Sequence, residues 1–325
     1  MPIASDIVDR LQELAGLRVS THVPLSSYTR FGIGGPAALF AETAHHDVFQ
    51  NALGIAHESG LPHVVIAGGT NLIVSDLGFR GLVLRFTGEQ MDVDGMRMRV
   101  EAGASLQAVV DRSIEASLQG MQTMTGIPGS LGAAVYGNAG AYGHSLNERV
   151  ERVHYTDGRK TSSLAGSECE FEYRGSIFKR RKRWVVLAAE LSFEAGDRSQ
   201  LQRQADEIRA VRDAKYPPTM KCAGSIFKNC FLSRLPPSVQ VEVPAKVVRE
   251  GKVPSAWFLE QVGAKGMRRG DIQVAAYHAN LIYNDGHGTA ADLVSVIADL
   301  KERIRHRFGF EIEEEVQYVG FHQGE

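Results

Sequence analysis

The segment KCAGSIFKNC, Lys221–Cys230, places two thiols, a hydroxyl and an ammonium group within ten residues. Such groups can act as nucleophile, proton donor or anion ligand. The thiols are the weakest candidates, because 3 cysteines in 325 residues are too few, and odd in number, for a disulfide framework. Cys and His are also never paired at the short spacing that zinc sites use, so we predict no metal site. We expect Cys222 and Cys230 to be reduced bystanders.

Two glycine-rich segments have the composition of anion-binding loops. They are AGGTNLIVSDLGFRG, Ala67–Gly81, and GIPGSLGAAVYGNAGAYG, Gly126–Gly143. Glycine lets backbone N–H groups approach an anion closely and permits the left-handed turns that point several of them at one oxygen. Neither segment is a G-x-G-x-x-G fingerprint or a Walker loop. Either one alone could be a tight turn with close backbone packing, whereas the two together favour a ligand with two phosphates, such as a dinucleotide.

Composition excludes several other classes of function. The formal net charge is -2, from 36 basic and 38 acidic residues, so no general affinity for nucleic acid is indicated. No apolar run approaches the ~18 residues that a membrane helix needs. The N-terminal stretch MPIASDIVDRLQEL contains Asp6 and Asp9 and has apolar residues at helical spacing, which predicts a helix capped by Ser5 rather than a signal peptide. We therefore predict a cytoplasmic location and no membrane partner.

These candidate groups must be positioned by a mixture of strands and helices, which indicates an α+β fold class. In the first two thirds we predict strands at AALFAE, HVVIAGG and GLVLRF, a helix over 45–60 and a second helix capped by Ser105. A mostly β region follows, with a hairpin turn at Asp157-Gly158.

The last third begins with a charged helix that Pro217 and Pro218 end. The region 231–254 has the composition of a loop. After it we predict a short helix at SAWFLEQVG, a strand at NLIYN, a long helix over 289–308 and a final strand at FEIEEEVQYVG.

Several segments occur together in a familiar order. They are YTRFGIGGPA, AGGTNLIVSDLGFRGLVL, GIPGSLGAAVYGNAGAYG, YRGSIFK, AGSIFKN, HANLIYN and FGFEIEEEVQYVG. With these motifs the chain, from about Leu25 to Gly320, resembles the UDP-N-acetylenolpyruvoylglucosamine reductases, also called UDP-N-acetylmuramate dehydrogenases. One motif would be weak support, whereas seven in register are specific. The tyrosine-bearing insertion of one subclass has no counterpart between Leu191 and Lys215, which indicates the shorter subclass.

The resemblance implies a particular architecture and reaction. A two-part FAD-binding domain of the vanillyl-alcohol-oxidase-like type, expected at 23–196, would follow an N-terminal helix in 1–22, and a smaller α+β substrate-binding domain would occupy 197–325. FAD would be bound non-covalently and reduced by NADPH. Reduced FAD would then convert UDP-N-acetylglucosamine enolpyruvate to UDP-N-acetylmuramate, a precursor of the bacterial cell wall. We expect a monomer or weak oligomer.

The same resemblance assigns site residues. The catalytic set would be Arg174, Ser225 and Glu315, and substrate would also contact Lys228, Asn229 and Gln261. The expected FAD contacts are Gly68, Gly69, Thr70, Asn71, Leu72, Ile127, Pro128, Gly129, Gly132, Ala133, Asn138 and Gly140.

The chemistry explains why these groups are needed. Hydride addition to the β carbon of an enol ether conjugated to a carboxylate pushes negative charge onto the α carbon and the carboxylate. Arg174 has the planar set of donors that suits a carboxylate. Ser225 can protonate the α carbon because the carbanion is strongly basic. Glu315 would need a desolvated, protonated state to assist the developing charge.

Each assignment has a structural alternative. Arg174 could be a surface ion-pairing residue, Ser225 a turn or N-cap serine, and Glu315 a carboxylate that faces water. Cys230 and Glu314 also stand where the family commonly has proline. Two other functions remain open: a different flavin oxidase or dehydrogenase on the same fold, and a non-catalytic nucleotide-binding protein.

Overall fold

The chain passes repeatedly between two structural units. A computed structural model describes residues 3–321, so Met1, Pro2 and 322–325, which belong to the predicted terminal ranges, lie outside the described residues. Unit 1 consists of residues up to 23, 37–69 and 80–217, and unit 2 consists of 24–36, 70–79 and the residues from 218 onward. The functional domains expected at 1–22, 23–196 and 197–325 stay a prediction. The structural units differ from them because two short early segments pack with the C-terminal third.

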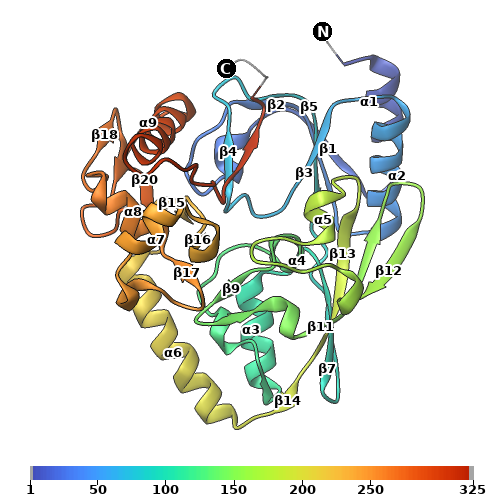
Figure 1. Ribbon diagram of the computed structural model, residues 1–325. Coiled ribbons are helices and arrows are strands. Elements are labelled where there is room, and N and C mark those ends of the chain that lie inside the picture. Colours follow the sequence, from blue (N-terminus) through green and yellow to red (C-terminus); the bar gives the residue numbers. More distant parts are fainter. Residues whose placement is uncertain (1–2, 322–325) are drawn as a thin grey trace. The chain divides into compact units, whose positions relative to one another are not determined.

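Unit 1 contains a four-stranded sheet covered by two helices. Its strands, in spatial order, are β1 (Arg18–Pro24), β2 (Pro36–Thr43), β5 (Phe79–Phe86) and β3 (His63–Ile66). Figure 1 shows α1 (Ser5–Gln12) beside α2 (His46–Glu58). Helix α2 buries Phe49, Leu53 and Ala56, at the three- and four-residue spacing of one helix face. The predicted cap of α1 is wrong: Ser5 is the first helical residue, and Ala4 precedes it without a side-chain cap.

The second sheet of unit 1 is antiparallel and has five strands. In spatial order they are β12 (Thr161–Ala165), β11 (Val150–Thr156), β13 (Val185–Ser192), β7 (Arg97–Glu101) and β6 (Met91–Asp94). The predicted hairpin turn is confirmed, because Gly158 has a φ of +83° and the Asp157 carboxylate accepts hydrogen bonds from Arg159 N and Lys160 N, at 2.9 and 3.0 Å. The central strand β13 is almost fully buried, and it anchors the core of this unit.

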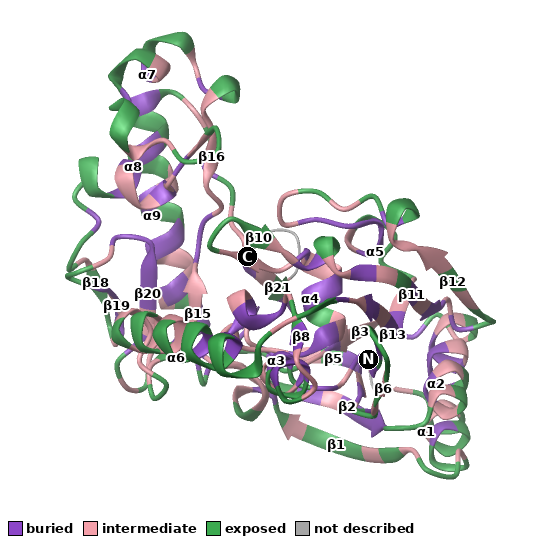
Figure 2. Cartoon of the chain, turned by 90° about the horizontal axis from the view of Figure 1, so that it is seen from below, coloured by how far each residue is buried: buried purple, intermediate pink, exposed green. Residues whose placement is uncertain are grey.

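Short strands and four helices complete unit 1. The strands are β8 (Leu118–Gln119), β9 (Gly140–Ala141), β10 (His144–Ser145) and β14 (Glu194–Ala195), and the helices are α3 (Leu106–Glu115), α4 (Leu131–Gly137), α5 (Ile177–Arg180) and α6 (Arg198–Lys215). Ser105 caps α3 as predicted, accepting a hydrogen bond from Ala108 N at 3.1 Å. Helix α6 buries only Leu201 and Ala205, and most of its surface is exposed (Figure 2).

Unit 2 is built on a second antiparallel sheet. Its strands, in order, are β15 (Lys221–Ser225), β20 (Leu281–Asn284), β19 (Ile272–Val274) and β18 (Arg268–Arg269). Helices α8 (Ser255–Gln261) and α9 (Ala290–Phe308) contribute apolar residues to its core. The loop 70–79 joins this unit because β4 (Leu72–Val74) pairs in parallel with β21 (Gln317–Val319). Asp76 of that loop accepts hydrogen bonds from Ala290 N and Ala291 N, at 2.8 and 3.0 Å, and so caps α9.

Two predictions for unit 2 need correction. The region 231–254 is not a plain loop: it contains α7 (Pro237–Glu242) and the strand pair β16 (Cys230–Phe231) and β17 (Lys252–Val253). Consecutive prolines hid this helix, although they occupy its N-cap and first position, where a missing N–H costs nothing. The final strand is also shorter than predicted, because only Gln317–Val319 finds a strand partner and Glu314 makes an isolated bridge to Phe227.

The described part of the chain does not meet the requirements of a membrane helix, a metal site or a disulfide bond. Between residues 3 and 321, no helix combines the length and apolar character that a bilayer crossing requires. Within the same residues no cluster of three or more His, Cys, Asp or Glu side chains could hold a metal ion. Cys169, Cys222 and Cys230 are free thiols. Burial raises the pKa of the Cys230 thiol to about 12, so this group stays protonated and unreactive near neutral pH.

Candidate active site

Unit 2 brings Ser225 and Glu315 onto neighbouring segments. Ser225 ends β15 and lies opposite Leu281, just after a shift in register and a left-handed glycine, Gly224, with a φ of +77°. The chain then continues beside the glutamate run: Glu315 N donates to Ile226 O at 2.7 Å. Lys228 N donates to Glu313 O at 2.9 Å, on the other side of the bridge to Glu314. These main-chain hydrogen bonds hold the segments of Ser225 and Glu315 side by side, although the two residues lie 90 positions apart in the sequence.

The first glycine-rich loop lies against the same glutamate. The side-chain amide of Asn71 donates to Glu315 O at 2.9 Å, and Gln317 N donates to Asn71 O at 2.9 Å. Gly69, at the start of this turn, is buried and has a φ of +60°. Unit 2 therefore collects part of the predicted cofactor loop together with two of the three predicted catalytic residues.

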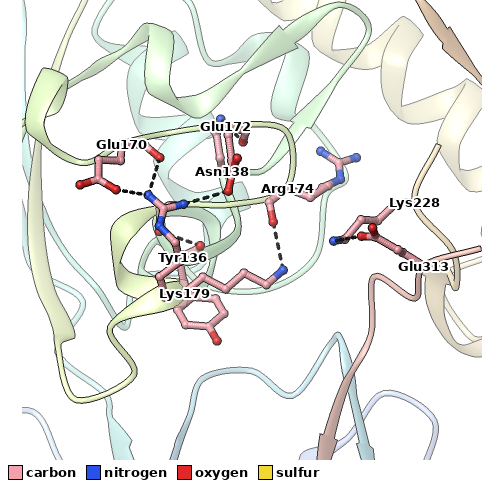
Figure 3. A network of polar contacts seen from close by, with 10 residues as sticks. Tyr136, Asn138, Glu170, Glu172, Arg174, Lys179, Lys228 and Glu313 are labelled. Atoms are coloured by element: carbon pink, nitrogen blue, oxygen red, sulfur yellow. Dashed lines mark hydrogen bonds and ion pairs between the residues drawn. The ribbon is translucent and has the colours of Figure 1, made fainter. Parts of the chain in front are cut away.

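The predicted substrate contacts of unit 2 have unequal surroundings. Lys228 is mostly covered and its ammonium lies 2.8 Å from a carboxylate oxygen of the exposed Glu313 (Figure 3). Such a half-exposed ion pair stabilises by no more than ~1 kcal/mol, so an anionic ligand can compete for the ammonium. Asn229 accepts a hydrogen bond from Ser255 N at 3.3 Å. Gln261 is exposed and ends α8.

Arg174 belongs to unit 1 and lies at the tip of a tight turn. Its φ is +58°, a left-handed conformation that costs a non-glycine residue roughly 1–2 kcal/mol. The turn is closed by reciprocal hydrogen bonds between Glu172 and Gly175, at 3.0 and 3.1 Å, and Lys179 donates to Arg174 O at 3.0 Å (Figure 3). The guanidinium donates to Gly140 O at 3.1 Å. Strain of this kind persists where the surroundings impose it, which is common at functional sites.

The second glycine-rich loop is bound to the Arg174 turn. Asn138, which is 5% exposed and has a φ of +43°, donates from its amide to Glu172 O and accepts from Asn147 N, both at 3.1 Å. Ser176 donates to Tyr136 O at 2.8 Å. Unit 1 thus fixes the predicted carboxylate-binding arginine directly onto the predicted cofactor loop.

Two family models match the chain. One, described as the FAD binding domain, matches residues 37–159. The other, described as the C-terminal domain of UDP-N-acetylenolpyruvoylglucosamine reductase, matches residues 216–319.

Whole-length relatives carry the same description. A UDP-N-acetylenolpyruvoylglucosamine reductase of Solibacter usitatus is 58% identical over 96% of this chain and 100% of its own length. The chain belongs to the UDP-N-acetylenolpyruvoylglucosamine reductase family. Another member, from Syntrophus aciditrophicus, is 32% identical over 98% of both chains. The crystal structure of the enzyme from Thermus caldophilus is 26% identical and superimposes with a TM-score of 0.73 over 93% of this chain and 99% of that one.

Membership of this reductase family confirms the predicted α+β fold class with an FAD-binding domain, and the loops fit that cofactor. Between Gly126 and Gly143 no side chain carries a charge, and the same holds for Ala67–Asn71, so no carboxylate opposes a phosphate there. Gly129 has a φ of +114°, a backbone conformation that residues with a side chain rarely adopt and that glycine allows in anion-binding turns. A Cβ on Gly137, the last residue of α4, would meet no atom within 4 Å apart from its chain neighbours and its own helix, so there is open space beside it. FAD supplies this family with its hydride-transferring ring.

Three of the predicted FAD contacts also have contacts within the protein. Gly132 N donates to Ala102 O at 2.9 Å, and a Cβ there would approach the Ala102 side chain to 2.9 Å, so the packing of α4 also needs a glycine here. Ala133 N donates to the Ser130 cap, and the Asn138 side chain bonds Glu172 O and Asn147 N, outside the glycine-rich loop. The roles in binding FAD stay predictions for Gly68, Gly69, Thr70, Asn71, Leu72, Ile127, Pro128, Gly129, Gly132, Ala133, Asn138 and Gly140.

Sequence analysis missed two polar residues of unit 2. Asn280 and Ser255 are 3% and 0% exposed, and both bond the segment that follows Ser225. The available signal was weak: Asn280 is in the HANLIYN motif, and Ser255 precedes the apolar helix SAWFLEQVG. Neither motif reveals which backbone groups a buried amide or hydroxyl will meet.

Proposed function

We propose that this chain reduces the enolpyruvyl group of UDP-N-acetylglucosamine enolpyruvate to give UDP-N-acetylmuramate, with Arg174, Ser225 and Glu315 as its catalytic residues. Family membership makes it an FAD-containing oxidoreductase that acts on a UDP-sugar and uses NADPH. The observation that carries the residue assignment is the pairing of the Ser225 and Glu315 segments beside Asn71. FAD, when bound, would supply the hydride for the β carbon of the substrate, and NADPH would be its reductant.

Arg174 binds the carboxylate of the substrate. A guanidinium presents two parallel donors to a carboxylate and keeps its charge at every relevant pH. The turn that carries it is fixed by Glu172, Gly175 and Lys179, so the donors need little reorganisation when negative charge develops. A left-handed backbone at this position aims the side chain differently from its neighbours, which gives the strain a function.

Ser225 donates a proton to the α carbon once the hydride has arrived at the β carbon. The C=C bond is reduced by one hydride and one proton, and the serine regains its proton from solvent. Glu315, on the neighbouring segment, contacts the same reacting region, where a protonated carboxyl would donate a hydrogen bond rather than repel the developing charge. Lys228 exchanges its partner Glu313 for an anionic group of the sugar nucleotide, and Asn229 and Gln261 add polar contacts.

Anaerobic flavin spectroscopy tests this function. The purified protein should be yellow and release its flavin on denaturation, NADPH should bleach it, and UDP-N-acetylglucosamine enolpyruvate should restore the colour with formation of one UDP-N-acetylmuramate per flavin. Recolouring by oxygen but not by the sugar nucleotide would instead indicate another flavin oxidase on this fold. A colourless protein that still binds nucleotides would indicate a non-catalytic role. The oligomeric state and a cytoplasmic location stay predictions.

A further inference from the structure

The side chain of Asn280 bonds both backbone polar groups of one residue near Ser225. The amide oxygen accepts from Phe227 N at 2.9 Å, and the amide nitrogen donates to Phe227 O at 2.9 Å. The backbone carbonyl of Asn280 also accepts from Ile226 N at 3.2 Å. Two opposed residues of an antiparallel ladder exchange hydrogen bonds in this way, so the amide replaces a missing strand partner.

Ser255 completes this arrangement. Its hydroxyl accepts from the Asn280 amide at 2.7 Å and donates to Phe227 O at 3.2 Å, and its backbone N–H donates to the Asn229 side chain at 3.3 Å. We call Asn280 and Ser255 the polar clamp. The clamp is fully buried and its amide and hydroxyl are hydrogen-bonded, so its geometry is well determined.

The clamp holds one edge of a segment whose other edge is also held. Residues 226–228 bond Asn280 and Ser255 on one side, and Glu313 and Glu315 on the other. Ile226 and Phe227 are buried at 0% and 1% exposure, which anchors the segment in the core. The partly exposed residues at its ends are Ser225, Lys228 and Asn229, which are the residues assigned to proton donation and substrate binding.

We propose that Asn280, together with Ser255, is a positioning residue that fixes the Ser225 hydroxyl for proton transfer. This inference rests on the proposed function. A displacement of about 1 Å in a catalytic group can lower a rate by on the order of 10²-fold, so a clamp two residues from the hydroxyl has a large effect without touching substrate. Apolar side chains would fill the same space, but they would leave the backbone groups of Phe227 without these partners.

The two half-reactions distinguish positioning from general support of the fold. In anaerobic stopped-flow experiments, Asn280→Ala should slow reoxidation of the reduced flavin by the sugar nucleotide by on the order of 10²-fold. Reduction of the flavin by NADPH should change by less than about threefold, because it does not use Ser225. Asn280→Asp keeps the shape but sets a carboxylate oxygen against Phe227 O, so its loss should be at least as large. Ser255→Ala should show the same selectivity with a smaller loss.

A double-mutant cycle tests whether Asn280 acts through Ser225. If the clamp only positions the hydroxyl, adding Asn280→Ala to Ser225→Ala should slow reoxidation by no more than about twofold further. If Asn280 had only a structural role, the slowing in the double variant would equal the product of the slowing in the two single variants. The solvent isotope effect on reoxidation should also rise in Asn280→Ala alone, because proton transfer becomes the slow step.

Asn284, the last residue of β20, is a matched control for Asn280, which directly precedes that strand. It is 4% exposed, donates to Phe31 O at 3.0 Å and accepts from Gly286 N and Gly288 N, so it is an equally buried amide that bonds backbone. Asn284→Ala should reduce thermal stability about as much as Asn280→Ala does. It should either leave both half-reactions unchanged or slow both by the same factor. Only the Asn280 variant should raise amide hydrogen exchange in peptides that span 222–230.

The possible outcomes separate the two proposals. Equal slowing of both half-reactions by Asn280→Ala, multiplicative effects in the cycle, or the same selectivity in Asn284→Ala would overturn positioning by Asn280. If Asn280→Ala does not fold with flavin, Asn280→Asp and Ser255→Ala decide, and wild-type reoxidation rates in both would overturn it. A wild-type enzyme that NADPH bleaches but the sugar nucleotide does not recolour would overturn the proposed function, and with it any role of Asn280 in proton transfer.

Discussion

The two units hold their predicted catalytic residues by different physical means. In unit 1, Arg174 lies in a strained left-handed turn that is tied to a glycine-rich loop through backbone carbonyls. In unit 2, Ser225 and Glu315 lie on extended segments that are held by the polar clamp and by each other's main chain. One residue is fixed by imposed backbone geometry, and the others by buried hydrogen bonds with little strain in the residues themselves.

This difference predicts how each region responds to substitution. Replacing a strained left-handed residue by glycine can relieve backbone energy while activity is lost, so stability and activity change in opposite directions. Removing a buried amide leaves unpaired backbone groups, so stability and activity fall together. Substitutions in the Arg174 turn should therefore separate stability from activity, whereas substitutions in the polar clamp should lower both.

The largest expected effect is at Ser225, the residue that the clamp serves. Ser225→Ala removes the proton donor, so reoxidation by the sugar nucleotide should slow by about 10²–10⁴-fold. Flavin reduction by NADPH should stay near the wild-type rate, as single-turnover absorbance can measure. The exposed Ser233→Ala is the control and should leave both rates unchanged. Equal slowing of both half-reactions by Ser225→Ala would contradict the role of proton donor.

Substitutions of Arg174 test the strained side of the comparison. Arg174→Lys replaces two parallel donors by a point charge, and reoxidation by the sugar nucleotide should slow by on the order of 10²–10³-fold. Arg174→Ala and Arg174→Gly should be at least as slow. Because only glycine adopts a φ of +58° readily, the glycine variant should be more stable than the alanine variant by ~1 kcal/mol in denaturant unfolding. Equal stability of these two variants would show that the turn is not strained.

The elements of the fold were predictable wherever a local pattern decides them. The helix over 289–308, the Ser105 cap and the Asp157-Gly158 hairpin follow from spacing and turn residues, and the structure confirms them. The final strand was overpredicted, since a run of β-type residues becomes a strand only where a partner strand is available. Helix α7 was missed because two prolines resemble a loop when their place in a helix is unknown.

The candidate site was predictable only in part. Arg174, Ser225 and Glu315 were assigned through whole-chain motifs, and family membership supports the chemistry that they would perform. Asn280 and Ser255 were not found, because a buried polar group is recognised by its partners, and these partners lie 25 to 53 positions away. Likewise, the close contact of Gly132 with Ala102 depends on how α4 packs, which the sequence motif does not reveal.

A smaller effect is expected where the first glycine-rich loop meets α9. Asp76→Ala removes the carboxylate that accepts from Ala290 N and Ala291 N, and should lower the free energy of unfolding by about 0.5–2 kcal/mol. Asp76→Asn keeps one acceptor and should lose less. Both can be measured by denaturant titration. A larger loss in the asparagine variant would mean that Asp76 does not act as a cap.

The smallest effect concerns His57, a partly buried histidine of unit 1. Burial lowers the pKa of His57 below its ordinary value of 6.5, and the nearby charges of His63 and Arg183 add to this. The unfolded chain therefore binds a proton that the folded protein excludes, so this histidine makes stability fall as pH decreases below about 6.5. His57→Leu keeps an apolar contact with His63, whose ring centroid lies 4.8 Å away, and removes the titration. Denaturant unfolding between pH 7.5 and 5 (range chosen around the ordinary imidazole pKa) should show a shallower loss in the variant. Superimposable profiles would mean that His57 is protonated equally in the folded and unfolded states.

In unit 2 the corresponding buried polar groups are amides and hydroxyls, which do not titrate, so Asn280→Ala should lower stability by the same amount at every pH in this range.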